Sequence, residues 1–81
     1  MTQDKLPKKI VDSVVLQLFE IRKAKKLSHE TVAQLSKLHR STISLTESRK
    51  MQPTLLTLLK IAHALDCDLS RFLAKAEKEN R

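Results

Sequence analysis

Apolar residues recur along most of the chain at the three- and four-residue spacing of amphipathic helices. The longest stripe lies in the first third of the sequence and contains Ile10, Val11, Val14, Val15, Leu18 and Ile21. Four shorter stripes follow it, and polar segments separate them. No segment alternates apolar and polar residues convincingly as a half-buried strand would. The pattern predicts an all-α fold of five helices, at about residues 7–25, 29–36, 40–48, 55–65 and 69–81.

Capping signals support these boundaries. Pro7 suits the first position of a helix, where its missing N–H is not needed. Ser28, Thr54 and Asp68 stand where the N-caps of the second, fourth and fifth helices are expected. Pro53 closes the loop before the fourth helix.

The same stripes predict which side chains form the core. The second helix is expected to bury Val32, Ala33 and Leu35. The predicted core face of the fourth helix contains Leu55, Leu58, Leu59, Ile61, Ala62 and Leu65. The predicted core face of the fifth contains Leu69, Phe72 and Leu73.

The spacing between the second and third helices is the most informative feature. Ala33, Leu38 and Ile43 can meet in the crook between two short helices joined by a sharp turn. A small side chain at 33 lets the helices approach, Leu38 fills the turn, and Ile43 points inward from the third helix. This is the pattern of a DNA-binding helix-turn-helix, whose second helix enters the major groove.

The first helix has an apolar face too wide for one neighbour. Val11, Val15 and Phe19 lie beside its main stripe. An aromatic residue on a second face is compatible with a partner surface. The alternative is that this small domain simply buries it.

Composition and charge narrow the class of protein. Hydrophobic residues make up 41% of the 81 residues and charged residues 31%, which favours a folded single domain over a disordered chain. The formal net charge of +7 suggests a polyanionic partner, either nucleic acid or an anionic membrane surface. A basic protein that is merely soluble is the alternative.

Other features indicate where the protein acts. No apolar run has transmembrane length, and no signal-peptide core follows the first residues, so we expect no membrane association. The single cysteine, Cys67, cannot form an internal disulfide, which fits the reducing cytoplasm.

Taken together, these motifs make the chain resemble the lambda-repressor-like helix-turn-helix family of Cro- or XRE-type regulators. The resemblance covers residues 18–73, between an N-terminal extension of helix one (1–17) and a charged C-terminal tail (74–81). Residues 1 to about 6 are expected to fray. The motifs that carry the resemblance are Leu18-x-x-Ile21-Arg22, Leu27-Ser28, Ala33, Leu38, Ser41-Thr42-Ile43-Ser44, Glu47, Pro53, and Leu55 to Leu65 followed by Leu69 and Phe72.

The resemblance implies a compact five-helix domain that binds operator DNA, usually as a symmetric dimer. It also implies that Arg22 pairs with Glu47. The dimer interface is expected either on helix five (Phe72, Leu73, Ala76) or on the extra face of helix one (Val11, Val15, Phe19).

Three positions depart from the family pattern. Lys37 stands in the turn where glycine is frequent, and a left-handed residue with a Cβ costs roughly 1–2 kcal/mol. His39 replaces the usual Ser or Thr cap of the recognition helix. Leu45-Thr46 inverts the usual polar-then-apolar order, so that either Leu45 is exposed in the groove or the third helix is slightly rotated.

Candidate DNA contacts follow from these placements. Base reading is assigned to Arg40, Ser41 and Ser44, with Leu45 available to a thymine methyl. For Arg40, a phosphate contact or full solvation is the alternative. Phosphate contacts are assigned to His29, through the backbone N–H groups around it, and to Lys37, Thr42, Arg49 and Lys50.

No catalytic or metal site is expected. His29, His39 and His63 have no metal-binding spacing with Cys67, which is expected to fill a small gap in the core. No cofactor is expected either. His63 should lie on the outer side of its helix.

Two classes of function remain. The first is a sequence-specific transcription regulator, either a repressor or an autoregulatory controller, switched by its own concentration because no sensor domain is recognised. The second is an antitoxin-like module that holds a partner protein and autoregulates its operon. The long apolar first helix and the tail of the fifth helix could serve such a partner.

Overall fold

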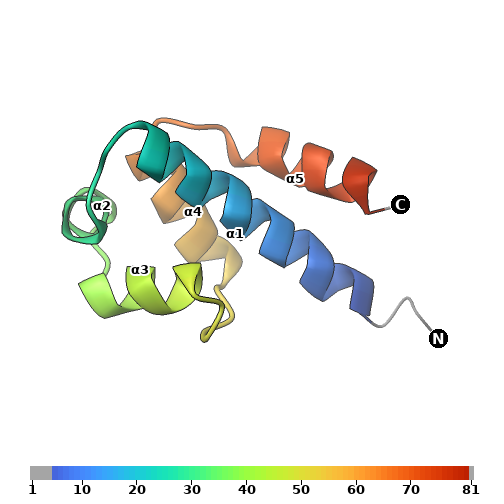
Figure 1. The fold of residues 1–81 in the computed structure, drawn as a ribbon, viewed down its shortest axis with the longest axis horizontal. Coiled ribbons are helices and arrows are strands. Elements are labelled where there is room, and N and C mark those ends of the chain that lie inside the picture. The colour runs from blue at the N-terminus through green and yellow to red at the C-terminus, as the bar shows by residue number, and fades with distance from the viewer. Residues whose placement is uncertain (1–4, 81) are drawn as a thin grey trace.

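Five α-helices make up the fold, which the computed structural model describes for residues 5–80 (Figure 1). They are α1 Leu6–Ala24, α2 His29–Ser36, α3 Arg40–Glu47, α4 Leu55–Ala64 and α5 Leu69–Glu79. No strand occurs between residues 5 and 80. The predicted all-α fold is confirmed, and each helix lies within two residues of its expected bounds. Residues 1–4, where fraying was expected, and residue 81 lie outside the described part of the chain.

The helices surround one core. α1 runs through the middle of the molecule with α5 alongside it, while α2 and α3 lie at the end away from the N-terminus of α1 (Figure 1). Residues with no exposed surface come from all five helices and include Val14, Leu18, Val32, Ile43, Ile61 and Ala76. Burying such aliphatic side chains is the main stabilising contribution in a domain of this size.

The packing of α5 along α1 corrects part of the predicted dimer surface. Val15 and Phe19 are only 2% and 3% exposed, and Ala76 is fully buried. The Gln17 side chain, itself buried, donates from Nε2 to the carbonyl of Phe72 at 3.0 Å and ties the two helices together. Val15, Phe19 and Ala76 therefore belong to the core of this chain and offer no surface to a second one. The wide apolar face of α1 is covered by other helices of the same chain, since α1 packs against α3 and α4 as well as against α5.

The other predicted interface residues lie at the edge of this packing. Val11, Phe72 and Leu73 are partly buried against the core. Their place in a dimer interface remains a prediction. Most of the apolar surface of each side chain is already buried within this chain.

Three leucines that were expected in the core are exposed instead. Leu35 is 56% exposed, Leu55 62% and Leu59 47%. α2 and α4 are short helices, and each buries only the side that faces its neighbours, where Val32 and Leu58 lie. The sequence pattern placed too many apolar positions of each helix on the core side.

Most of the predicted caps are present. The Ser28 hydroxyl accepts the N–H of Thr31 at 3.0 Å, and the Thr54 hydroxyl accepts the N–H of Thr57 at 3.1 Å. Asp68 occupies the N-cap position of α5 as predicted. Its side chain, however, accepts no capping hydrogen bond.

The first four helices end in the same way although the chain contains no glycine. A residue with φ near +60° follows each helix or its C-cap: Lys26, Lys37, Arg49 and Asp66. The N–H of the next residue then returns to a carbonyl five residues earlier, at 2.9–3.1 Å, as in Leu27 to Arg22 and Cys67 to Ala62. This is the Schellman arrangement, which is usually made by glycine because a Cβ raises the energy of left-handed backbone.

We therefore predict that Lys26→Gly and Asp66→Gly each stabilise the protein by about 0.5–1 kcal/mol, because removing the Cβ relieves left-handed strain by more than the added flexibility costs. The two changes alter the net charge in opposite directions, so a shared gain cannot be electrostatic. Urea unfolding measures the effect. Lys26→Ala, which keeps the Cβ, is the control and should show no such gain; equal behaviour of Ala and Gly would contradict the strain argument.

Candidate nucleic-acid interface

Residues 29–47 form a helix, a three-residue turn and a second helix. α2 ends at Lys37, whose φ and ψ of 60° and 34° place it in the left-handed region predicted for the turn. The Leu38 N–H donates to the carbonyl of Ala33 at 3.0 Å and closes the turn. His39 is extended and starts α3, and its side chain makes no capping hydrogen bond, as the sequence predicted.

The inner face of this motif is packed as the spacing indicated. Ala33 is 5% exposed, Ile43 is fully buried, and Leu38 packs against the core from the turn. The structure also decides between the two alternatives for the Leu45-Thr46 pair: Thr46 is fully buried and Leu45 is 38% exposed. α3 thus directs Thr46 into the core and leaves Leu45 at its surface.

The four residues assigned to base reading share the outer side of α3. Arg40, Ser41 and Ser44 are exposed, and Leu45 lies beside them. Their side chains form no intramolecular hydrogen bond or ion pair among the described residues. This face combines a guanidinium fork, two hydroxyls and a methyl-bearing side chain, the groups that can distinguish base edges in a major groove.

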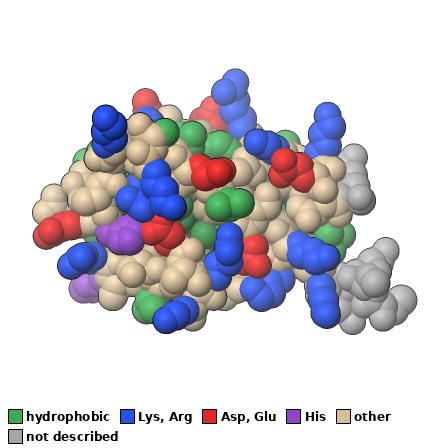
Figure 2. Space-filling view, viewed as in Figure 1, with side chains coloured by type: hydrophobic (Ala, Val, Ile, Leu, Met, Phe, Trp, Pro, Cys, Tyr) green, Lys and Arg blue, Asp and Glu red, His purple; other side chains and the backbone are tan. Residues whose placement is uncertain are grey.

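Cationic residues lie at both ends of α3. Lys37 is exposed in the turn before it, and Arg49 and Lys50 are exposed in the loop after it. Thr42, also assigned to phosphate, is half-buried on the first turn of the helix. On the face visible in Figure 2, Lys and Arg side chains are scattered along the whole molecule, while histidines gather at the α2–α3 end.

The N-terminus of α2 adds backbone donors near this surface. The Ser28 cap satisfies the N–H of Thr31, which leaves the first amides of the helix, including that of His29, without an intrahelical acceptor. Such amides at the positive end of a helix bind phosphate oxygens.

One ionic cluster fixes α3 relative to α1. Arg22 donates from Nη2 to Oε1 of Glu47 at 2.8 Å and from Nη1 to the carbonyl of Leu27 at 2.7 Å. The two ionic side chains are only 13% and 19% exposed, and the Arg22 guanidinium also lies 5.9 Å from the centre of the Phe19 ring. The pair implied by the family resemblance is confirmed.

The cluster has a third member that sequence reasoning missed. Nε2 of His29 contacts Oε2 of Glu47, so both carboxylate oxygens are engaged. The sequence analysis gave His29 a backbone role only. The two residues are eighteen positions apart and no local sequence pattern connects them, so the sequence carried no signal for this contact.

These contacts set the charge state of Glu47. Burial acts to raise the pKa of its carboxyl, but the hydrogen bonds from Arg22 and His29 together outweigh burial and leave the pKa below its ordinary value of 4.5. The carboxylate is therefore ionised across the neutral pH range.

Other chemistry finds little support between residues 5 and 80. They contain no group of three metal-ligating side chains, and no helix with the length and apolarity needed to cross a bilayer.

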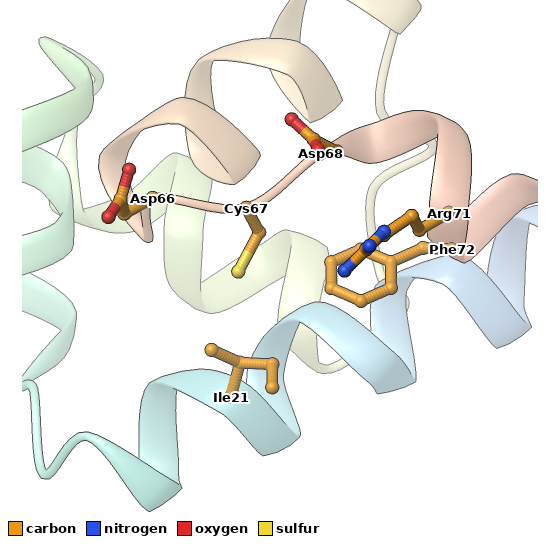
Figure 3. Close-up of a pocket in the computed structure, with 6 residues that line it drawn as sticks. All are labelled: Ile21, Asp66, Cys67, Asp68, Arg71 and Phe72. Carbon is orange, nitrogen blue, oxygen red and sulfur yellow. The ribbon is translucent and has the colours of Figure 1, made fainter.

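An open hollow of about 440 Å³ lies between α1 and the α4–α5 connection, with the sulfur of Cys67 pointing toward Ile21 (Figure 3). Cys67 is only partly buried and donates to the carbonyl of Leu65 at 3.3 Å, so it borders this hollow and only partly fills a core gap. His63 is exposed on α4, as predicted.

The ionic cluster predicts a pH-dependent coupling. Arg22→Met or Glu47→Gln alone should cost about 3–5 kcal/mol, because each removes the ionic partner of a partly buried charge, and the double variant should cost less than the sum. The lowered pKa of Glu47 means that this contribution is present above pH 4.5 and is lost as the pH falls through the folded-state value. Urea melts at pH 7 and pH 3 measure both effects. Absence of coupling at pH 7, or a coupling that does not weaken once the pH is low enough to protonate Glu47, would contradict the assignment.

Thr46 gives a second prediction from the same helix. Its hydroxyl is fully buried and has no hydrogen-bond partner among residues 5–80. Thr46→Val replaces the hydroxyl with a methyl of similar size, so the unfolding free energy should rise by about 1 kcal/mol. Thr42→Val, on the half-buried side of α3, serves as the control and should change stability less. A loss of stability in Thr46→Val would show that the hydroxyl has a partner.

Comparison with known proteins agrees with this geometry. A family model described as helix-turn-helix matches residues 18–72, which spans the end of α1 through the first part of α5. No curated protein matches the chain significantly. The matched segment contains the turn, the recognition helix and the Arg22–Glu47 pair, and its family is one of DNA-binding regulatory domains. The chain therefore belongs to the lambda-repressor-like, Cro/C1-type helix-turn-helix family.

Proposed function

We propose that this DNA-binding domain is a small transcription regulator that recognises one operator sequence. The observation that carries the proposal is the outer face of α3, where Arg40, Ser41, Ser44 and Leu45 are free of intramolecular partners in the described structure. Side chains in this position on a recognition helix meet base edges.

Arg40 is the main specificity residue of the proposal. It opens α3, and its planar fork matches O6 and N7 of guanine. Ser41 and Ser44 can donate to or accept from any base, while Leu45 offers apolar contact to a thymine methyl. Arg40 therefore supplies most of the sequence preference, and the other three refine it.

Phosphate binding holds the helix in register. Lys37 lies before α3, and Arg49 and Lys50 lie after it, so that cations bracket the groove-facing helix at both ends. The free amides around His29 and the first turn of α3 at Thr42 add uncharged donors. The net charge of +7 supports this assignment through long-range attraction to DNA.

The operator in this proposal is a pseudo-palindrome bound by a homodimer. One recognition helix contacts few base pairs, so two copies are needed for useful specificity, with half-sites roughly 34–36 Å apart. The protein then acts in the cytoplasm as a repressor or as an autoregulatory controller.

The antitoxin-like alternative has less apolar surface on α1 and α5 than the sequence analysis gave it. Val15 and Phe19 of α1 and Ala76 of α5 are buried within the chain. No observation on α1 or α5 now favours a partner-holding role over operator binding.

The proposal is tested by separating base readers from phosphate contacts. After selecting bound duplexes from genomic DNA, affinity is measured for the selected operator and for its single-base variants at several salt concentrations. Arg40→Ala should cost about 1–3 kcal/mol and relax preference at one base pair per half-site, because the guanine contact is lost. Lys50→Ala should weaken binding to all sequences equally and reduce the salt slope by about one per subunit.

Lys9→Ala, an exposed cation on α1 away from α3, is the matched control for lost charge and should alter neither preference nor slope by as much. If Arg40→Ala loses the same factor on every sequence, Arg40 contacts phosphate and base reading belongs to Ser41, Ser44 and Leu45. If no duplex is selected over random DNA, the proposed function fails.

A further inference from the structure

The most unusual surface of this molecule is the outer side of α4. Leu55 is 62% exposed, Leu56 61% and Leu59 47%, all on one ten-residue helix. Residues three and four apart lie on the same face of a helix, so these side chains are contiguous. We call them the α4 leucine stripe. The other exposed leucines among the described residues, Leu16, Leu35 and Leu45, occur singly on α1, α2 and α3.

α4 is apolar on both sides, which distinguishes it from an ordinary surface helix. Leu58, Ile61 and Ala62 face the core and are at most 5% exposed. A helix that is hydrophobic all round is normally buried, and a clustered apolar patch on a small protein marks a contact surface. Within the described chain, only one side of α4 is covered.

We propose that the α4 leucine stripe packs against the same stripe of a second copy of this chain, an inference that rests on the proposed operator function for its two-fold geometry. A symmetric contact requires a surface complementary to itself, and an uncharged leucine stripe meets this requirement. Two chains with a net charge of +7 repel one another, so their contact needs a face with few cations. Among the residues of α4, Lys60 is half-buried and His63 alone adds an exposed ionisable group.

The position of the stripe also fits this partner. The stripe begins at Leu55, the first residue of α4, a few residues after the loop that carries Arg49 and Lys50 of the proposed DNA surface. A contact there would hold two α3 helices on the same side of a dimer, as a pseudo-palindromic operator requires.

The size of the stripe sets the strength of the contact. A stable interface uses about 20–30 residues on each side, whereas the stripe provides three leucines and a polar rim that includes Gln52 and His63. The dimer is accordingly of the weak, exchanging class, with monomer and dimer both present at micromolar to high-micromolar concentrations.

Sedimentation equilibrium of the full chain, without DNA, tests the proposal. The Leu55→Gln/Leu56→Gln variant should raise the dimer dissociation constant at least about tenfold, because each change removes apolar contact twice in a symmetric interface. Leu16→Gln/Leu35→Gln is the matched control, with similar exposure on α1 and α2, and should dimerise like the unmodified chain. Circular dichroism melts establish that both variants are folded.

Disulfide formation gives a second readout that does not depend on a loss of stability. In a Cys67→Ser background, Leu59→Cys should form cross-linked dimers on mild oxidation, whereas the equally exposed Leu16→Cys should not. Equal cross-linking at both positions, a stripe variant that dimerises normally, or an unmodified chain that stays monomeric at high-micromolar concentration would each overturn the proposal.

The two proposals fail separately. An unmodified chain that dimerises through the stripe but selects no duplex would contradict operator binding and leave this interface in place. A chain that binds duplex DNA only as a monomer would contradict the interface, and the stripe would then be open to a different protein.

Discussion

The buried ionic cluster around Glu47 is the constraint on which the rest of the motif depends. It joins three segments at once: Arg22 on α1, the end of α3 at Glu47, and the start of α2 at His29. Arg22 also holds the carbonyl of Leu27, so the connection between α1 and α2 is fixed by the same side chain. With few buried side chains available in a domain of this size, a directional contact of this kind sets an angle that apolar packing alone would leave loose.

The orientation of α3 matters because this short helix contributes both to the core and to the proposed DNA-binding surface. It buries Ile43 and Thr46 on one side and presents Arg40 and Ser44 on the other. A rotation of α3 about its axis by one residue, about 100°, would exchange Leu45 for Thr46 in the core and turn the exposed face away from a groove. The cluster at its C-terminus and the Leu38 contact at its N-terminus together prevent that rotation.

The helix junctions support this rigidity without glycine. Each of the first four helices ends with a left-handed residue that carries a side chain, and in three of the four junctions the next residue, Leu27, Leu38 or Cys67, packs against the core. The chain accepts backbone strain at these junctions, and the hydrogen bonds and apolar contacts that follow each one offset it. Three of the four residues are Lys or Arg, which also places positive charge at the negative ends of helices.

The sequence alone determined the helices, their boundaries, the turn and the outer face of α3. It did so because these depend on local spacing: caps at Ser28 and Thr54, the left-handed position of Lys37, and the inward set of Ala33 and Ile43. Only the tertiary structure decided which apolar side chains are buried and which remain exposed. Phe19 is buried because α1 packs against several helices, and Ala76 because α5 lies along α1, while Leu55 and Leu59 are exposed because no helix of residues 5–80 covers the outer side of α4. Periodicity identifies the apolar faces of a helix, but whether a face is covered depends on where the neighbouring helices lie. The same reason explains the His29 contact to Glu47, which joins residues eighteen positions apart that no local pattern connects.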